Sequence, residues 1–136
     1  MKNIPTDIEI LEAIFEKYYP AFLELSPLET GERRSPFFPI DIRQIAEGFD
    51  VDPDIVFARL YYHLENKYKY DKVSLFQLQI GGKQNAVHLP YLSSILADLR
   101  VEDKRHRWSL ILSLISVVVA ALSFLLSTVS VIIAKS

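Results

Sequence analysis

The 136-residue sequence has no cysteine and, over one long stretch, no charge. Without cysteine the chain can form no disulfide and perform no thiolate chemistry, which is typical of a protein kept in a reducing compartment. No charged residue occurs among the 27 residues from Trp108 to Ala134. Because about 20 apolar residues cross a bilayer core, this run predicts a membrane span. The alternative is an apolar core helix within a larger complex.

The flanks of the apolar run predict its topology. Residues 1–16 contain five charged side chains and no uninterrupted apolar stretch, so no secretory signal peptide is expected. Only Lys135 and Ser136 follow the run, which suggests a tail anchor, most simply in a bacterial inner membrane. Cations concentrate on the N-terminal side, which places the N-terminal domain in the cytoplasm. The expected membrane-interface anchors are Lys104, Arg105, Arg107 and Trp108.

The part of the chain before the span has no excess of positive charge. Up to Arg107 it holds 14 Lys and Arg against 17 Asp and Glu, a net charge of −3 with His neutral. General attraction to nucleic acid or anionic lipid is therefore not expected. The Lys104–Arg107 cluster could hold anionic headgroups, but positioning of the span is the favoured role.

Helix signals dominate the first half of the sequence. Thr6-Asp7-Ile8-Glu9 is a capping box, and an apolar stripe follows it at Ile8, Leu11, Phe15, Tyr18 and Phe22. Pro20 should kink or restart this helix, and the proline- and glycine-containing segment 26–39 should be a loop. Asp41 can cap a short second helix that Gly48 helps to end. Asp52-Pro53 should start a third helix that runs to about Tyr68.

A change of period then predicts a hairpin. Val73–Ile80 has the alternation of a strand, residues 81–84 form a turn, and Asn85–Leu89 returns as a second strand. Pro90 can start a fourth helix that continues into the anchor.

This order of elements resembles that of the winged helix-turn-helix family. The resemblance covers about residues 6–100. It is most specific at Ala46, where a small residue is needed between two helices, and at Val56 and Leu60, where the second helix packs back. Asp50 stands near the usual glycine of the turn. The expected fold is α+β: a winged-helix-like domain (1–100), a basic segment (101–107) and a transmembrane helix (108–134), the alternative being an unrelated small α+β domain.

In nucleic-acid-binding members of this family the second helix of the motif enters the major groove. The outward positions of that helix should here be Ile55, Arg59, Tyr62, His63 and Asn66. A single arginine near Asp54 and Glu65 is a poor surface for phosphates, so nucleic acid is not the favoured partner. The lysines around the predicted wing could form a basic patch, but the favoured role for them is to keep the edge of the domain soluble: Lys67, Lys69, Lys72 and Lys83. The candidate nucleic-acid or protein contacts are Arg59, Tyr62, His63, Lys67 and Lys83.

The apolar run carries a regular seam of small side chains. Their spacing alternates between four and three residues: Ser109, Ser113, Ser116, Ala120, Ser123, Ser127, Ser130 and Ala134. Small residues let membrane helices approach closely, and a seven-residue period implies a left-handed crossing. The seam therefore predicts association with itself or another membrane helix. The alternative is that each serine only bonds its own backbone.

The same register extends backwards through Leu92, Ile95 and Leu99. These three side chains are expected to pack on the core of the domain rather than to prolong the seam. One helix of about 45 residues would then connect the domain to the membrane.

No catalytic, metal or cofactor signature is present. Gly81-Gly82-Lys83 lacks the flanking residues of a phosphate-binding loop, and His63, His88 and His106 lack metal-ligand spacing. No nucleophile elbow occurs, so neither enzymatic activity nor a cofactor is expected.

Three functions are compatible with these features. The favoured one is a membrane-tethered module that recruits a cytoplasmic protein. The others are a membrane-anchored transcription regulator and a small oligomeric effector whose serines line a polar path through the membrane.

Overall fold

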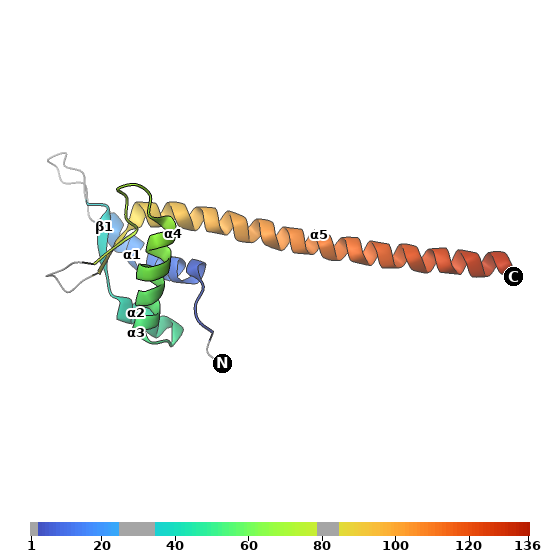
Figure 1. The fold of residues 1–136 in the computed structure, drawn as a ribbon, viewed down its shortest axis with the longest axis horizontal. Coiled ribbons are helices and arrows are strands. Elements are labelled where there is room, and N and C mark those ends of the chain that lie inside the picture. Colours follow the sequence, from blue (N-terminus) through green and yellow to red (C-terminus); the bar gives the residue numbers. More distant parts are fainter. Residues whose placement is uncertain (1–2, 25–34, 79–84) are drawn as a thin grey trace. The chain divides into compact units, whose positions relative to one another are not determined.

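The computed structural model describes residues 3–24, 35–78 and 85–136. The chain divides into two compact units, residues 1–98 and residues 99–136. The described residues are mostly helical, with a small three-stranded sheet and one long apolar helix at the C-terminus (Figure 1).

Helix α1 (Asp7–Glu24) begins at the predicted capping box. The Glu9 amide donates to Thr6 Oγ1 over 3.4 Å, and the Thr6 amide donates to Glu9 Oε2 over 2.7 Å. The bond from the Thr6 amide, together with one from the Thr6 hydroxyl to the same oxygen over 2.9 Å, favours the carboxylate and lowers the pKa of Glu9 below its ordinary value. The predicted restart of the helix at Pro20 does not occur, because α1 continues through this proline to Glu24. Pro20 and Glu16 are exposed, so water can satisfy the Glu16 carbonyl that proline leaves without a donor.

The buried face of α1 is centred on Ile10 and Ile14 rather than on the predicted stripe. Leu11 and Phe22 are buried as predicted, whereas Ile8, Phe15 and Tyr18 are only half-buried. Apolar residues occupy more than one face of this helix, so their spacing alone did not identify the inner face.

Helix α2 (Ile42–Phe49) starts at the predicted cap, where Asp41 Oδ1 accepts from the Arg43 amide over 2.9 Å. The prediction that Gly48 ends this helix was wrong. Asp50 ends it in the left-handed conformation, with φ 54° and ψ 43°. The Val51 amide then donates to the Ala46 carbonyl over 3.2 Å, which completes a Schellman motif.

The third helical segment runs without interruption from Pro53 to Tyr68, as predicted. It consists of α3 (Pro53–Ala58), a π-helical turn η1 (Arg59–Leu64) and α4 (Glu65–Tyr68). The inner face of this segment, which packs in the core, is formed by the fully buried Val56, Leu60 and Leu64. Ala46 is also fully buried, in keeping with the need for a small residue there.

The sheet is antiparallel with strand order β1-β3-β2. Strand β1 (Phe37–Ile40) pairs with β3 (Asn85–His88), whose other edge pairs with β2 (Phe76–Gln77). β1 lies where a loop was predicted, because Phe-Phe-Pro-Ile has no alternation and its pairing partner is distant in sequence. β2 is shorter than the predicted Val73–Ile80 strand, and the predicted turn at 81–84 lies outside the described residues.

Helix α5 (Leu89–Lys135) begins one residue before Pro90. Its first turn is capped by a side chain, because the Tyr91 amide donates to His88 Nδ1 over 3.0 Å. Leu92 and Ile95 are buried in the N-terminal unit, as predicted, whereas Leu99 is only half-buried and falls in the second unit. Leu96, which is not part of the heptad register, is also buried. The N-terminal unit therefore includes the start of the same helix that carries the apolar run.

Gly48 offers a test of helix stability. It lies inside α2, and a methyl group added there would meet no atom within 4 Å. Because glycine within a helix costs roughly 0.5–1 kcal/mol relative to alanine, Gly48→Ala should raise the free energy of unfolding by about that amount. Denaturant unfolding checks this, with Gln44→Ala on the same helix as the control. A loss of stability in Gly48→Ala would contradict the prediction.

His88 should make stability depend on pH. Burial lowers the pKa of its imidazole, and Nδ1 must be unprotonated to accept from Tyr91. The stabilisation is therefore complete above the ordinary histidine pKa of about 6.5 and decreases as pH falls below it. Melting temperatures at about pH 7.5 and about pH 5.5 should differ more in the wild type than in His88→Asn, whose amide oxygen caps at both values. Equal differences would exclude His88 as the titrating group.

Candidate interaction surfaces

Three basic side chains of the third helical segment lie around one carboxylate. Asp7, in the first turn of α1, accepts from Arg59 Nε through Oδ1 over 2.6 Å. Its Oδ2 lies 3.1 Å from His63 Nε2 and 3.8 Å from Lys67 Nζ. The three basic residues are four positions apart, so they lie along one side of the helical segment. The Asp7 side chain is 14% exposed, so this ion cluster is partly shielded from water.

The outward orientation predicted for Arg59 and His63 is only partly correct, because both side chains point to Asp7. They remain 37% and 44% exposed, respectively. Tyr62 is outward as predicted, with 67% exposure, and Ile55 is 41% exposed. We refer to this surface as the α3–α4 face, defined by its exposed or partly exposed residues Ile55, Arg59, Tyr62, His63, Asn66 and Lys67. The remaining candidate contact, Lys83, lies outside the described residues.

Aromatic rings support the α3–α4 face from beside it. Tyr62 packs edge-on against Tyr61 with ring centroids 5.0 Å apart. Tyr61 stacks on Phe57 at 5.5 Å, and Phe57 meets Phe76 of β2 edge-on at 6.1 Å. These contacts reduce the freedom of Tyr61, so that Tyr62 projects from a packed base.

Glu65 ties the same helical segment to the sheet. Its Oε2 accepts from the amides of Leu75 and Phe76, each over 2.8 Å. A carboxylate that accepts two amides is a strong acceptor, and it fixes the position of β2 relative to α4. Glu65 therefore has a structural role, and its negatively charged carboxylate is held at the start of β2.

The second surface is the exposed apolar part of α5. Every residue from 101 to 136 is exposed. An apolar window within α5 is long enough to cross a membrane. Such a surface is not stable in water and needs either lipid or another protein around it.

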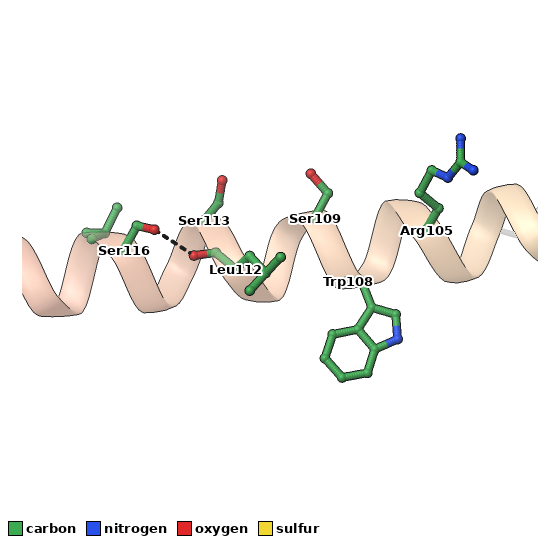
Figure 2. A pocket seen from close by; sticks show the side chains of 7 residues that line it. Arg105, Trp108, Ser109, Leu112, Ser113 and Ser116 are labelled. Atoms are coloured by element: carbon green, nitrogen blue, oxygen red, sulfur yellow. Dashed lines mark hydrogen bonds between the residues drawn. The ribbon is translucent and has the colours of Figure 1, made fainter.

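Three serines of the small-residue seam, Ser109, Ser113 and Ser116, line a shallow, open hollow near the start of the apolar run, together with Arg105, Trp108, Leu112 and Val117. Figure 2 shows Ser109 and Ser113 on the same side as Arg105, with Trp108 on the opposite side. The hydroxyls of Ser116 and Ser123 donate to the carbonyls of Leu112 and Val119, each over 2.9 Å. These two serines therefore bond their own backbone, and their oxygens keep lone pairs that can accept from a second helix.

The basic flank of the span contains one internal ion pair. Arg107 Nε lies 3.1 Å from Asp103 Oδ2, one helical turn earlier. Lys104, Arg105 and Trp108 are exposed, as the side chains of membrane-interface anchors need to be.

The chain matches no protein-family model, no curated protein and no solved structure. Within residues 3–24, 35–78 and 85–136 no group of three or more His, Cys, Asp or Glu side chains is placed to hold a metal ion. A hollow of about 430 Å³ between α1 and α2 has a mixed lining of Ala13, Glu16, Lys17, Gln44, Ile45, Gly48 and Phe49.

The ion cluster around Asp7 predicts an asymmetry between its members. Asp7→Asn leaves three neighbouring basic side chains without their shared carboxylate, and we expect it to lower the free energy of unfolding by about 1 kcal/mol. Lys67→Gln removes only the longest contact and should change it by less than about 0.5 kcal/mol. Chemical denaturation measures the free energy of unfolding of both variants. Added salt should reduce the difference in stability between them, because it screens the charges. If Asp7→Asn is as stable as the wild type, the cluster does not hold α1 against α3–α4.

Proposed function

We propose that this chain is a membrane-tethered adaptor: a winged-helix domain that binds a protein partner, and an anchor that associates through its small-residue seam. The observation that carries the proposal is helix α5, whose first turns are buried in the N-terminal unit and whose residues from Trp108 to Ala134 are exposed and uncharged. A helix of this kind needs lipid or other helices around it.

Element order and sheet order support the winged-helix assignment. The order is helix, strand, helix, helix, strand, strand, and the sheet order β1-β3-β2 places the last strand between the other two. The turn between α2 and α3 contains a left-handed residue at Asp50, where the family usually has glycine. Asp tolerates this conformation better than most residues.

Length and flanking charge support the membrane assignment. The 27 residues from Trp108 to Ala134 extend about 40 Å as a helix, more than the roughly 30 Å of a hydrocarbon core. Lys104, Arg105 and Arg107 precede the span and favour a cytoplasmic N-terminal unit, in a bacterial inner membrane or its equivalent.

The charges of the N-terminal unit favour a protein partner over DNA. Arg59, the arginine of the α3–α4 face, already pairs with Asp7. DNA binding needs several cationic contacts to phosphates, and the part of the chain before the span has a net charge of −3. No contact in the described part of the chain favours a transcription regulator or a pore over the adaptor.

The seam gives the anchor a means of association. Leucine on one helix gains little by leaving lipid for leucine on another. Serine and alanine instead allow close backbone approach, and serine oxygens can accept hydrogen bonds across the contact. The exposed faces next to the seam are Leu, Ile, Val and Phe, which suit lipid.

The adaptor is tested on full-length protein gently extracted from its own membranes. Native mass spectrometry should find a discrete complex, either of several copies or with another protein. Ser116→Leu combined with Ser123→Leu should weaken this complex about tenfold while the protein stays in the membrane fraction, because leucine separates the backbones.

The matched control is Val118→Leu combined with Leu125→Phe, which adds bulk away from the seam and should leave the complex intact. If wild type gives only monomers without a partner, the adaptor function is rejected. If the serine double variant assembles like wild type, the seam has no part in assembly.

A further inference from the structure

We infer that the α3–α4 face binds an acidic segment of the partner protein that also carries an apolar side chain. This inference rests on the adaptor function proposed above and specifies the chemistry of its partner. It is carried by the juxtaposition of Arg59, Lys67 and exposed Tyr62 with a carboxylate that the chain itself supplies, Asp7.

The face already holds one carboxylate. Asp7 Oδ1 bonds Arg59 Nε over 2.6 Å, while Oδ2 faces His63 and Lys67. The geometry therefore demonstrates, within one chain, that these side chains converge on a single acidic group from another element.

The site has capacity for a second carboxylate. The contacts of Arg59 within the described residues use only Nε, so the two terminal nitrogens of its guanidinium remain free to donate. Lys67 Nζ is at the long distance of 3.8 Å from Asp7 and is 49% exposed. Guanidinium nitrogens bind carboxylates with paired hydrogen bonds, and such charge-assisted bonds are about twice as strong as neutral ones.

Local charge favours an acidic ligand. Arg59 and Lys67 carry two positive charges against the one carboxylate of Asp7, before any charge on His63 is counted. Glu65 keeps its negative charge, but its Oε2 is held by the amides of Leu75 and Phe76 rather than by Arg59 or Lys67. Within the ion cluster the basic side chains thus outnumber the one carboxylate, in an N-terminal region whose net charge is negative.

The apolar part of the face favours a peptide over a nucleic acid. Tyr62 is 67% exposed and Ile55 is 41% exposed, and two helical turns separate them on the same side of the segment. Tyrosine supported by packed rings is a typical anchor of protein interfaces. An exposed isoleucine and few cations do not suit a phosphate backbone.

Asp7 is then an internal competitor for the ligand. A partner carboxylate must either bind beside Asp7 at the terminal nitrogens of Arg59 or replace it. Removing the Asp7 charge should therefore strengthen binding, although it weakens the fold. A purely structural ion cluster makes the opposite prediction, since loss of Asp7 would leave binding unchanged or reduce it.

The test uses the full chain in phosphatidylcholine nanodiscs, whose lipid carries no net charge. The probe is a short synthetic peptide in which glutamates alternate with phenylalanines, and fluorescence anisotropy measures its dissociation constant. We expect Lys67→Gln and Tyr62→Ala each to weaken binding about tenfold, and Asp7→Asn to strengthen it several-fold. Both weakening variants change exposed side chains, so the fold should be retained.

Two variants match the loss of charge elsewhere. Lys17→Gln on α1 and Arg105→Gln in the basic flank each remove one positive charge, and each should bind the peptide as the wild type does. A peptide with lysine in place of glutamate should not bind. A DNA duplex should not displace the acidic peptide.

The inference is overturned if Lys67→Gln and Tyr62→Ala bind like wild type, if the lysine peptide binds equally well, or if the DNA duplex displaces the peptide. These outcomes differ from failure of the adaptor function. If one of these outcomes is found but native mass spectrometry still shows the wild-type chain with a protein partner, the adaptor function stands. The partner then binds another surface of the chain.

Discussion

Backbone amides and carbonyls that lose their regular partners set the main constraint on this structure. An unpaired polar group buried away from water costs as much as a lost hydrogen bond. In the N-terminal unit, side chains supply the missing hydrogen-bond partners. Glu9 and Thr6 cap α1, Glu65 accepts from the amides leading into β2, and His88 caps α5. In the proposed membrane span no water can replace a partner, and α5 keeps its backbone groups paired there because it is one helix from Leu89 to Lys135.

Much of the fold follows from local signals in the sequence. The capping box at Thr6, the cap at Asp41 and the Asp52-Pro53 start each act within one helical turn, so the sequence predicts them directly. β1 was not predicted, because Phe37–Ile40 becomes a strand only by pairing with Asn85–His88. The end of α2 was misassigned to Gly48, because an Asp in the left-handed conformation is uncommon and only the geometry identifies it.

The two candidate surfaces differ in how far the sequence predicts them. The seam of the anchor is a property of spacing on one helix, so the sequence determines its members completely. The α3–α4 face depends on Asp7, which lies 52 residues before Arg59 in sequence and meets it only after folding. Sequence analysis proposed Arg59, His63 and Lys67 as candidate contacts but could not show that an internal carboxylate lies beside all three.

The proposed surfaces also complement each other energetically. The α3–α4 face offers two cations and one exposed tyrosine and competes with Asp7, so a single copy should bind its partner weakly. Association of anchors through the seam would present two or more such faces from one membrane. A partner with several acidic segments would then bind each further face at a high effective concentration, which raises overall affinity by 10²–10⁴ without any new contact. Weak single sites and an associating anchor are therefore consistent parts of one mechanism, in which only assembled copies retain the partner.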